Sequence, residues 1–370
     1  MNVVSIVGAR PQFVKAAILV PELVRSGCSH GLIHTGQHYD YAMSQVFFDQ
    51  LDLPAPDVSL DVGSASHAAQ TAEMMRRLEP ALESLRPDLA IVYGDTNSTL
   101  AGAVTAAKMC IPVAHVEAGL RSFDWEMPEE VNRIVADHVS RLHFAPTQAA
   151  ANRLAHEGIT SNVHVVGDVM VDLVMRTAQS LPVRPAVLDR LQLSRKGYAV
   201  ATIHRASNTA DLEAFGQIIG GLERLPMPVI FPVHPRTEPL ARALGLDNRV
   251  DSGASRIVAI EPLPYVDMIG LLRDARVVVT DSGGLQKEAM TLAVPCVTLR
   301  DATEWPETVA AGWNRLVGND PDAIEEAALA SPPNSAPPRC YGDGRTAMRI
   351  AKLVAHETIA QPEDPVVVRL

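Results

Sequence analysis

Short apolar runs alternate with longer stretches of helical periodicity along the first half of this 370-residue chain. The longer stretches, such as Ala68–Leu85 and Thr99–Lys108, repeat apolar residues every three or four positions, which predicts amphipathic helices. Runs that are apolar throughout predict parallel strands covered by helices on both faces. The predicted strands are Val3–Val7, Gly31–Thr35, Leu89–Tyr93, Val113–Val116, Leu142–Ala145 and Val163–Val166.

A second series of strands and helices follows, and a chain of this length exceeds one ordinary core. Between the two series, Leu181 to Lys196 holds two prolines and many charges, which is typical of a connection. We therefore expect an α/β protein with two doubly wound parallel-sheet (Rossmann-like) domains facing a cleft, residues 1–168 and 169–352, and a C-terminal helix end and arm at 353–370. The second set of predicted strands is Tyr198–Ile203, Val229–Val233, Ile257–Ile260, Val277–Val279 and Cys296–Leu299.

Composition narrows the classes of function. The net charge of −11 argues against a broad surface for nucleic acid or an anionic membrane, so any phosphate needs a local site. The apolar N-terminus has no basic leader and is interpreted as a first strand, not as a signal peptide. No apolar run approaches the ~18 residues that span a bilayer. The four cysteines form no CxxC pair, and no zinc-ligand spacing occurs, which indicates reduced cytoplasmic thiols and no metal.

The segment around Gly283 and Gly284 gives the strongest indication of a ligand. An apolar run ends at Val279, and Ser282, Gly283 and Gly284 lead into a stretch of helical period. Such a helix start presents free backbone N–H groups at the positive end of the helix dipole, which favours phosphate. Glu288 follows one turn later, where a carboxylate can accept hydrogen bonds from a ribose. A turn whose glycines serve only backbone geometry is the alternative.

The first predicted domain has a different turn after its first strand. Arg10 lies in this turn and Lys15 lies on the first helical turn, so we expect both to face the cleft and hold an anion. Ordinary surface cations remain the alternative. The turn has neither a GxGxxG nor a Walker sequence, which argues against hydride transfer and nucleotide hydrolysis.

Carboxylates follow several predicted strands or begin helices. Asp95 and Glu117 each follow an apolar strand, and Glu129 follows Pro128 at a helix start. Core packing does not explain an acid directly after a buried strand, whereas partial burial at a cleft edge suits proton transfer. A helix cap at Asp95 and a first-turn acid at Glu129 remain open alternatives.

Histidines end two strands of the second predicted domain. His204 and Arg205 follow the first of these strands, and His234 closes the next. A histidine at a strand end is a candidate acid, base or phosphate donor, and a structural role is the alternative. The adjacency of His204 and Arg205 favours a functional role.

Ordered motifs run through nearly the whole chain, from Gly8 to about Ile350. They are Gly8-x-Arg10-Pro11-x-x-x-Lys15, Gly94-Asp95-Thr96, His115-Val116-Glu117-Ala118-Gly119-Leu120-Arg121, Pro128-Glu129-Glu130-x-Asn132-Arg133, Thr202-x-His204-Arg205, Asp281-Ser282-Gly283-Gly284-Leu285-Gln286-x-Glu288, Arg300-x-x-Thr303-Glu304-Trp305-Pro306-Glu307 and Gly342-Asp343-Gly344. In order and spacing the motifs resemble those of the non-hydrolysing UDP-N-acetylglucosamine 2-epimerases. Two positions depart from the family pattern: Gln12 stands where many relatives carry Glu, and Ser207 stands where Glu usually precedes Asn208.

The resemblance implies the two-domain GT-B fold, with the last helix crossing back to the first domain. It also implies a cytoplasmic homodimer without a cofactor that supplies precursors of surface polysaccharides. The implied catalytic residues are Asp95, Glu117, Glu129 and His204. The implied residues for binding substrate and UDP are Arg10, Lys15, Arg133, His234, Tyr265, Ser282, Gly283, Gly284, Glu288 and Arg315.

The reaction of such an epimerase explains why several carboxylates are needed. The C2 proton of the sugar has no adjacent carbonyl, so it becomes removable only as the C1–O bond to UDP breaks. The intermediates are UDP and 2-acetamidoglucal, and re-addition to the other face converts UDP-GlcNAc into UDP-ManNAc. Acid–base groups must therefore act on both faces, and the departing diphosphate must be stabilised.

Four other functions remain open from the sequence. The substrate could be a modified UDP-sugar such as a UDP-2,3-diacetamido-glucuronate, or water could capture the intermediate in a hydrolysing 2-epimerase. A GT-B glycosyltransferase shares the fold, but it needs an acceptor site and usually one dominant base. A non-catalytic sensor of nucleotide sugars would not need Asp95 and Glu117 together.

Overall fold

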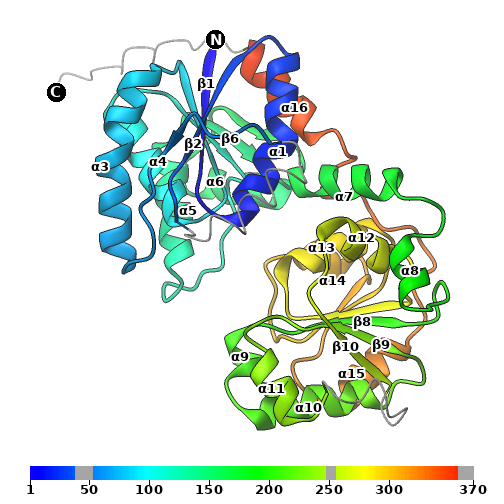
Figure 1. Ribbon diagram of the computed structural model, residues 1–370. Helices are drawn as coiled ribbons and strands as arrows, with labels where there is room; N and C mark the ends of the chain where they lie inside the picture. Colours follow the sequence, from blue (N-terminus) through cyan, green and yellow to red (C-terminus); the bar gives the residue numbers. More distant parts are fainter. Residues whose placement is uncertain (38–52, 247–255, 357–370) are drawn as a thin grey trace. The chain divides into compact units, whose positions relative to one another are not determined.

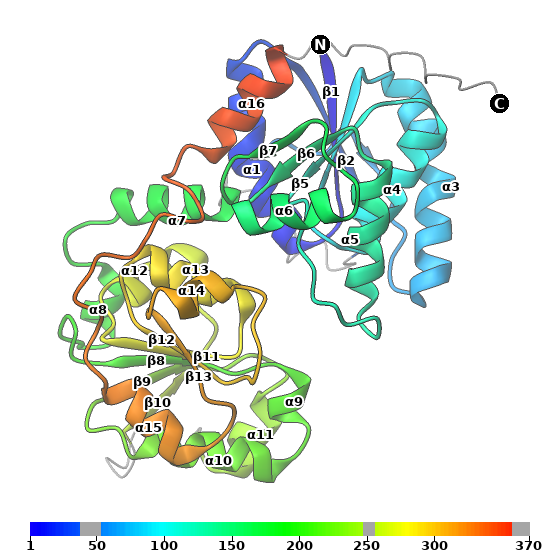
Figure 2. The same cartoon turned by 180° about the vertical axis from the view of Figure 1, so that it is seen from behind.

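The computed structural model describes residues 1–37, 53–246 and 256–356. These residues form two compact units (Figures 1 and 2). Unit 1 consists of Met1–Asp172 and the segment that begins at Tyr341, and unit 2 consists of Leu173–Cys340. Within the described ranges, no helix is both long enough and apolar enough to cross a membrane. The predicted C-terminal arm lies outside the described residues from 357 onward.

Unit 1 is built around one seven-stranded parallel sheet. Its strands are β1 (Asn2–Val7), β2 (Ser29–His34), β3 (Val58–Ser59), β4 (Leu89–Tyr93), β5 (Val113–Val116), β6 (Leu142–Ala145) and β7 (Val163–Val165). Its helices are α1 (Arg10–Arg25), α3 (His67–Leu85), α4 (Asn97–Lys108), α5 (Pro128–Val139), α6 (Gln148–His156) and α16 (Thr346–His356). The strand order β3-β2-β1-β4-β5-β6-β7 places β1 and β4 side by side, where the order of the chain reverses.

Alternate residues of the unit 1 strands pack on opposite helix layers. Val4 and Ile6 of β1 join a core with Met74 and Leu78 of α3 and with small residues of α4. On the other side of the sheet, α16 packs against α1 (Figure 1). Because both faces are covered, the strand ends are the part of the sheet that is left for ligands.

Unit 2 repeats this architecture with a six-stranded parallel sheet in the order β10-β9-β8-β11-β12-β13. Its strands are β8 (Ala199–Thr202), β9 (Val229–Pro232), β10 (Ile257–Ile260), β11 (Val277–Thr280), β12 (Cys296–Thr298) and β13 (Asn314–Leu316). Its helices are α8 (Ala186–Arg190), α9 (Ala206–Thr209), α10 (Leu212–Glu223), α11 (Glu238–Ala243), α12 (Tyr265–Arg273), α13 (Gly283–Thr291), α14 (Pro306–Ala310) and α15 (Pro321–Leu329), and α7 (Val169–Ser180) begins in unit 1 and continues into unit 2.

The alternation of strand residues also gives unit 2 two apolar layers. Ala201 and Phe231 pack with α10 and α15, whereas Val200 and Ile230 pack with α8, α12 and α13. β8 and β11 form the central pair, as β1 and β4 do in unit 1. The two sheets thus have equivalent points at which the strand order reverses.

The segment expected to connect the domains, Leu181 to Lys196, is instead part of the core of unit 2. Val187 and Leu188 are fully buried there, because the two prolines and the charges flank a short helix, α8, whose apolar residues pack on α12. In the sequence, unit 1 ends at Asp172 and unit 2 begins at Leu173. The chain returns to unit 1 at Tyr341, earlier than the expected position 353. α16 therefore belongs with unit 1.

Candidate functional site

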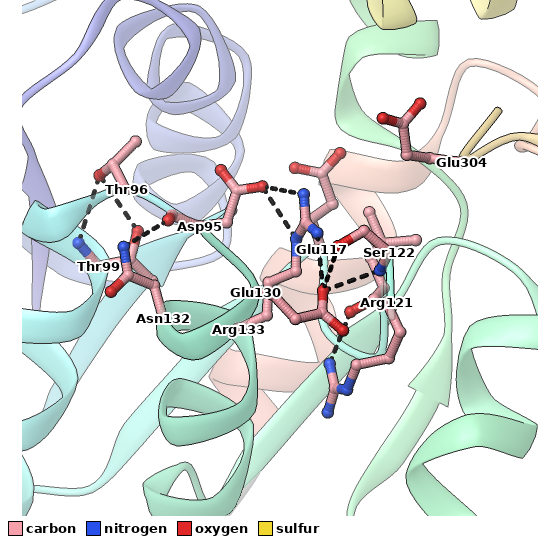
Figure 3. Close-up of polar contacts among 12 residues, drawn as sticks. Asp95, Thr96, Thr99, Glu117, Arg121, Ser122, Glu130, Asn132, Arg133 and Glu304 are labelled. Atoms are coloured by element: carbon pink, nitrogen blue, oxygen red, sulfur yellow. Dashed lines mark hydrogen bonds and ion pairs between the residues drawn. The ribbon is translucent and has the colours of Figure 1, made fainter. Parts of the chain in front are cut away.

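Arg133 of α5 joins two carboxylates of unit 1 (Figure 3). Its Nε and Nη2 atoms donate to Asp95 Oδ2 at 3.0 and 2.6 Å, and Nη1 donates to Glu130 Oε2 at 3.0 Å. Burial acts to lower the pKa of Arg133, but the attraction of Asp95 and Glu130 outweighs it and raises the pKa. The two hydrogen bonds from Arg133 hold the Asp95 side chain in place. Because this side chain is 32% exposed, a ligand can still reach it.

Asp95 lies at the strand end because the chain turns sharply after β4. Gly94 adopts a positive φ of 62°, which glycine accommodates without the steric cost that other residues have there. The helix cap is the next residue, since the Thr96 side chain accepts a hydrogen bond from the backbone of Thr99 (Figure 3). The alternative that Asp95 is the cap of α4 is therefore wrong.

Glu130 is the buried acid at the start of α5, and Glu129 is not. The Glu130 carboxylate accepts hydrogen bonds from Ser122 N at 2.8 Å, Ser122 Oγ at 2.8 Å and Phe123 N at 3.0 Å. Burial acts to raise the pKa of Glu130, but these donors and Arg133 lower it overall. Glu129 is half-buried, and no hydrogen bond or ion pair joins its side chain to another described residue. The structure thus does not bring Glu129 into this cluster.

Lys15 and Glu117 form the second paired group of unit 1. The Lys15 ammonium forms an ion pair with Glu117 Oε2, and both side chains are largely buried. Burial acts to lower the pKa of Lys15, but Glu117, Asp168 and Asp95 outweigh it and raise the pKa. Glu117 has a positive φ of 77°, which is uncommon for a residue with a side chain and is frequent at functional sites. Arg10, by contrast, is exposed at the first residue of α1.

A buried network lies behind the Gly94 and Glu117 turns. His115 Nε2 lies 2.7 Å from Gly94 O, and His115 Nδ1 lies 2.7 Å from Asp137 Oδ1. The other Asp137 oxygen accepts from Gly119 N at 3.1 Å and Arg121 Nη1 at 2.7 Å. Burial acts to raise the pKa of Asp137, but His115 and Arg121 lower it. Four fixed contacts therefore support the two turns that carry Asp95 and Glu117.

Gln12, the first departure from the family pattern, is buried and fully hydrogen-bonded. Its Oε1 accepts from the backbone N–H groups of Gly8 and Ala9 at 2.8 and 3.1 Å. Its Nε2 donates to Tyr93 O at 2.8 Å and Thr99 Oγ1 at 3.0 Å. An ionised Glu accepts hydrogen bonds only, so the amide suits this position in a way that a carboxylate does not.

In unit 2, the start of α13 has the geometry expected for phosphate. Ser282 is the residue that precedes α13, and Gly283 and Gly284 form its first positions. Both glycines have ordinary negative φ, and a Cβ at Gly284 would have only Ser282 Oγ within 4 Å, at 3.9 Å. Neither backbone geometry nor packing among the described residues requires glycine at 284, which favours a ligand over the purely structural alternative. Glu288 lies in the same helix and is 8% exposed.

His204 and His234 lie side by side at the ends of β8 and β9. Their rings are 5.4 Å apart and inclined by 33°. His204 Nδ1 lies 3.2 Å from Asp281 Oδ1, and Asp281 is fully buried at the end of β11. Asp281 is not among the residues that the sequence predicts for the site, although it belongs to the motif that contains Ser282. Its position directly after an apolar strand is the feature of the sequence that could have identified it as a candidate site residue.

A second group of charges surrounds Glu304. Arg300 donates two hydrogen bonds to its carboxylate, at 2.8 and 3.0 Å, and Arg205 Nη2 lies 3.4 Å from it. Burial acts to raise the pKa of Glu304, but the Arg300 hydrogen bonds and the charge of Arg205 lower it to about 2. A Cβ added to Gly283 would lie 3.6 Å from Glu304 Oε2, so this group adjoins the start of α13.

Three other positions that the sequence singled out, Tyr265, Arg315 and Ser207, also lie in unit 2. Tyr265 is the half-buried first residue of α12. Arg315 is exposed on the edge strand β13, which β12 separates from β11. Ser207, the second departure from the family pattern, is exposed on α9.

Comparisons with known proteins agree with this geometry. The sequence profile of the family described as UDP-N-acetylglucosamine 2-epimerase matches residues 22–355. A Methanococcus maripaludis protein named UDP-N-acetylglucosamine 2-epimerase homolog is 44% identical over 96% of this chain and 99% of its own length. The UDP-2,3-diacetamido-2,3-dideoxy-D-glucuronate 2-epimerase of Pseudomonas aeruginosa is 42% identical over 96% of this chain and 99% of its own.

A solved structure extends the comparison to three dimensions. The crystal structure of Methanocaldococcus jannaschii UDP-GlcNAc 2-epimerase in complex with UDP-GlcNAc and UDP matches with a TM-score of 0.83 and 38% identity, covering 96% of this chain and 100% of that one. The predicted α/β class, with two doubly wound parallel sheets of the GT-B fold class, is confirmed. The chain belongs to the UDP-N-acetylglucosamine 2-epimerase family.

Proposed function

We propose that this protein interconverts UDP-GlcNAc and UDP-ManNAc by eliminating and re-adding UDP. The observation that carries the proposal is the pair of strand-end acids in unit 1. Asp95 and Glu117 follow the neighbouring strands β4 and β5, and each is ion-paired with a buried cation. Two separately held carboxylates suit a reaction in which a proton leaves one face of C2 and returns on the other. The family membership supports the same reaction.

Unit 2 supplies the groups that bind UDP in this proposal. The first backbone N–H groups of α13, at Ser282, Gly283 and Gly284, bind the diphosphate, and Glu288 accepts hydrogen bonds from the ribose. Tyr265 and His234 complete the nucleotide contacts. His204 of unit 2 stabilises the negative charge that develops on the diphosphate, and Arg10 of unit 1 is assigned to the same charge.

Unit 1 supplies the proton chemistry. As the C1–O bond breaks, its electron pair goes to UDP, and a carboxylate among Asp95, Glu117 and Glu129 takes the C2 proton. Lys15 and Arg133 form ion pairs with Glu117 and Asp95 and hold the two carboxylates in place. In the reverse step a carboxylic acid returns a proton to the other face of C2, and UDP attacks C1. Atoms and charges balance without a hydride carrier.

Nuclear magnetic resonance of UDP-GlcNAc with the protein in deuterated water tests this proposal. We expect the 2-epimer to form and both the product and the recovered substrate to carry deuterium at C2. An epimer that retains its C2 hydrogen would exclude the elimination mechanism, and free 2-epimerised sugar with UDP would indicate a hydrolysing enzyme.

A second candidate substrate is UDP-2,3-diacetamido-2,3-dideoxy-D-glucuronate. It is favoured by the relative from P. aeruginosa, which is as similar to this chain as the relatives named for UDP-GlcNAc. The same experiment with this uronate decides between the two, because the proposal requires faster C2 exchange with UDP-GlcNAc.

Two further parts of the proposal concern the setting of the enzyme. We infer a homodimer that acts in the cytoplasm and supplies precursors of surface polysaccharides. The described cysteines form no disulfide, which suits a reducing compartment. Sedimentation equilibrium tests the dimer, and a mass of about 40 kDa, that of one chain, would contradict it.

A further inference from the structure

Asp281 is a fully buried carboxylate at the end of β11 that connects two neighbouring strand ends. Its oxygens accept hydrogen bonds from the backbone N–H groups of His204 and Arg205, both at 2.9 Å, and from Asn208 Nδ2 at 3.1 Å. All three donors follow β8, the strand that pairs with β11. Asp281 therefore fixes the backbone from which the His204 ring projects.

The same carboxylate also contacts the ring itself. His204 Nδ1 lies 3.2 Å from Asp281 Oδ1. An ionised carboxylate accepts hydrogen bonds and donates none, so this contact favours a proton on Nδ1 and leaves Nε2 for a substrate. The His204 side chain is 35% exposed although Asp281 is not exposed at all, so a ligand can reach the ring.

Other charged or titratable groups around His204 lie on different elements. The His234 ring is 5.4 Å away, and Arg236 Nη1 donates to His204 O at 3.3 Å. Arg205 is oriented toward Glu304. Among these groups, Asp281 is the carboxylate that contacts the ring of His204.

We propose that Asp281 is a positioning residue that holds His204 with its proton on Nδ1 and balances the positive charge when Nε2 is protonated as well. This inference rests on the proposed function. As the C1–O bond breaks, the Nε2 proton passes to the diphosphate oxygen that receives the electron pair, and the ring stays neutral with its Nδ1 proton. In the addition step the same proton returns to Nε2. The C2 proton follows its separate route through the carboxylates of unit 1.

Asp281→Asn separates this role from a purely structural one. The amide oxygen of Asn can still accept the backbone hydrogen bonds of His204 and Arg205, so the strand ends stay connected. The amide nitrogen then faces Nδ1 and donates to it, which forces the ring proton onto Nε2 and removes the balancing charge. A structural role would leave the ring proton unchanged.

The test records the ring nitrogens of His204 by NMR on ¹⁵N-histidine-labelled protein, at a pH well above the ordinary range of histidine titration. His204→Gln identifies the signal among the 12 histidines. We expect the proton on Nδ1 in the parent and on Nε2 in Asp281→Asn. The kcat on UDP-GlcNAc should fall about 10²-fold in Asp281→Asn while KM stays within a few-fold.

Asp274→Asn is the matched control, because Asp274 is also fully buried in unit 2 and pairs with Arg195 and Arg273. It should leave the His204 signal unchanged. A parent whose His204 carries its proton on Nε2 would overturn the inference, and this measurement does not depend on whether the variant folds. An unchanged kcat in folded Asp281→Asn would also overturn it. If the parent does not turn over UDP-GlcNAc, the proposed function fails, while the NMR result still decides the role of Asp281.

Discussion

The two units have the same strand order but place an aspartate differently at equivalent strand ends. β4 in unit 1 and β11 in unit 2 each pair with the first strand of their unit. Asp95 follows β4 after one glycine, and its side chain is 32% exposed and ion-paired with Arg133. Asp281 follows β11 directly, is fully buried and binds backbone N–H groups.

The difference shows how one topology serves two chemistries. In unit 1 the strand-end carboxylates are paired with buried cations, which suits the exchange of protons. In unit 2 the acid is turned inward, and the groups that remain accessible are the N–H groups of a helix start and a histidine, which suits an anion. The residue next to the strand, and not the fold, decides what each site can do.

The largest expected effect concerns the buried charges behind the strand ends of unit 1. Asp137→Asn removes the anion that pairs with both His115 and Arg121. Arg121 keeps its ion pair with Glu157, but the buried His115 loses its anionic partner, so the free energy of unfolding should fall by about 3 kcal/mol. Urea unfolding measures the change. Asp189→Asn, in a largely exposed pair with Arg184, is the control and should cost less than about 1 kcal/mol. Equal losses would show that the network is not what supports unit 1.

The second prediction concerns the acids that we assign to C2. Asp95→Asn and Glu117→Gln should each lower turnover of UDP-GlcNAc by on the order of 10²-fold, because each removes a group that transfers a proton. Initial rates of epimer formation measure the effect. Glu126→Gln, on the exposed loop before α5, serves as control. Turnover that stays within a few-fold of the parent in both variants would contradict this assignment.

The strands and helices of both units could be predicted from the sequence better than the side-chain contacts within them. Apolar runs such as Leu89–Tyr93 match the observed strands, because a strand buried on both faces must be apolar throughout. β3 and β13 escaped prediction, since β3 has two residues and β13 contains Asn314 and Arg315. The prediction that Leu181 to Lys196 connects the domains is wrong. The prolines and charges of this segment are typical of a connection, but three of its apolar residues are buried in the core of unit 2.

The strand-end positions of Asp95, Glu117 and His204 could also be predicted, because parallel strands end at the same edge of a sheet. Their partners could not. Arg133 is 38 residues from Asp95, and Lys15 is 102 residues from Glu117, so only the folded chain brings these pairs together. At the start of α5 the sequence offered two adjacent acids, and helical rotation placed Glu130 inside and left Glu129 half-buried.

The third prediction returns to Gln12, which connects the turn after β1 with the end of β4. Gln12→Glu replaces the donor to Tyr93 O and Thr99 Oγ1 with an acceptor. The carboxylate oxygen of the new Glu and the carbonyl oxygen of Tyr93 would then face each other, and both accept hydrogen bonds only. Such a pair is unfavourable in a buried site, so the free energy of unfolding should fall by about 1–3 kcal/mol. Urea unfolding at neutral pH measures this change. Ser207→Glu, at the exposed second departure from the family pattern, should have almost no effect on stability.

The fourth prediction uses pH to compare a partly buried carboxylate of unit 2 with an exposed one. The pKa of Glu304 is lowered to about 2, so the unfolded chain binds this proton more readily than the folded one does. Its contribution to stability is complete above the unfolded value of about 4.3 and is lost as the pH falls toward the folded value. In Glu304→Gln, the melting temperature should depend less on pH below about 4.3. The exposed Glu213→Gln should keep the dependence of the parent.

The division of work between the units is tested most directly by calorimetric titration of UDP into Glu117→Gln and Glu288→Ala. Glu117→Gln should bind UDP within a few-fold of the parent, because Glu117 acts on the sugar. Glu288→Ala, measured on protein whose circular dichroism shows that it is folded, should lose about 1–3 kcal/mol of UDP binding free energy, because a charged hydrogen bond to the ribose is lost. If Glu288→Ala binds UDP as tightly as the parent, or if Glu117→Gln loses as much affinity as Glu288→Ala, the assignment of nucleotide binding to unit 2 and of proton transfer to unit 1 is wrong.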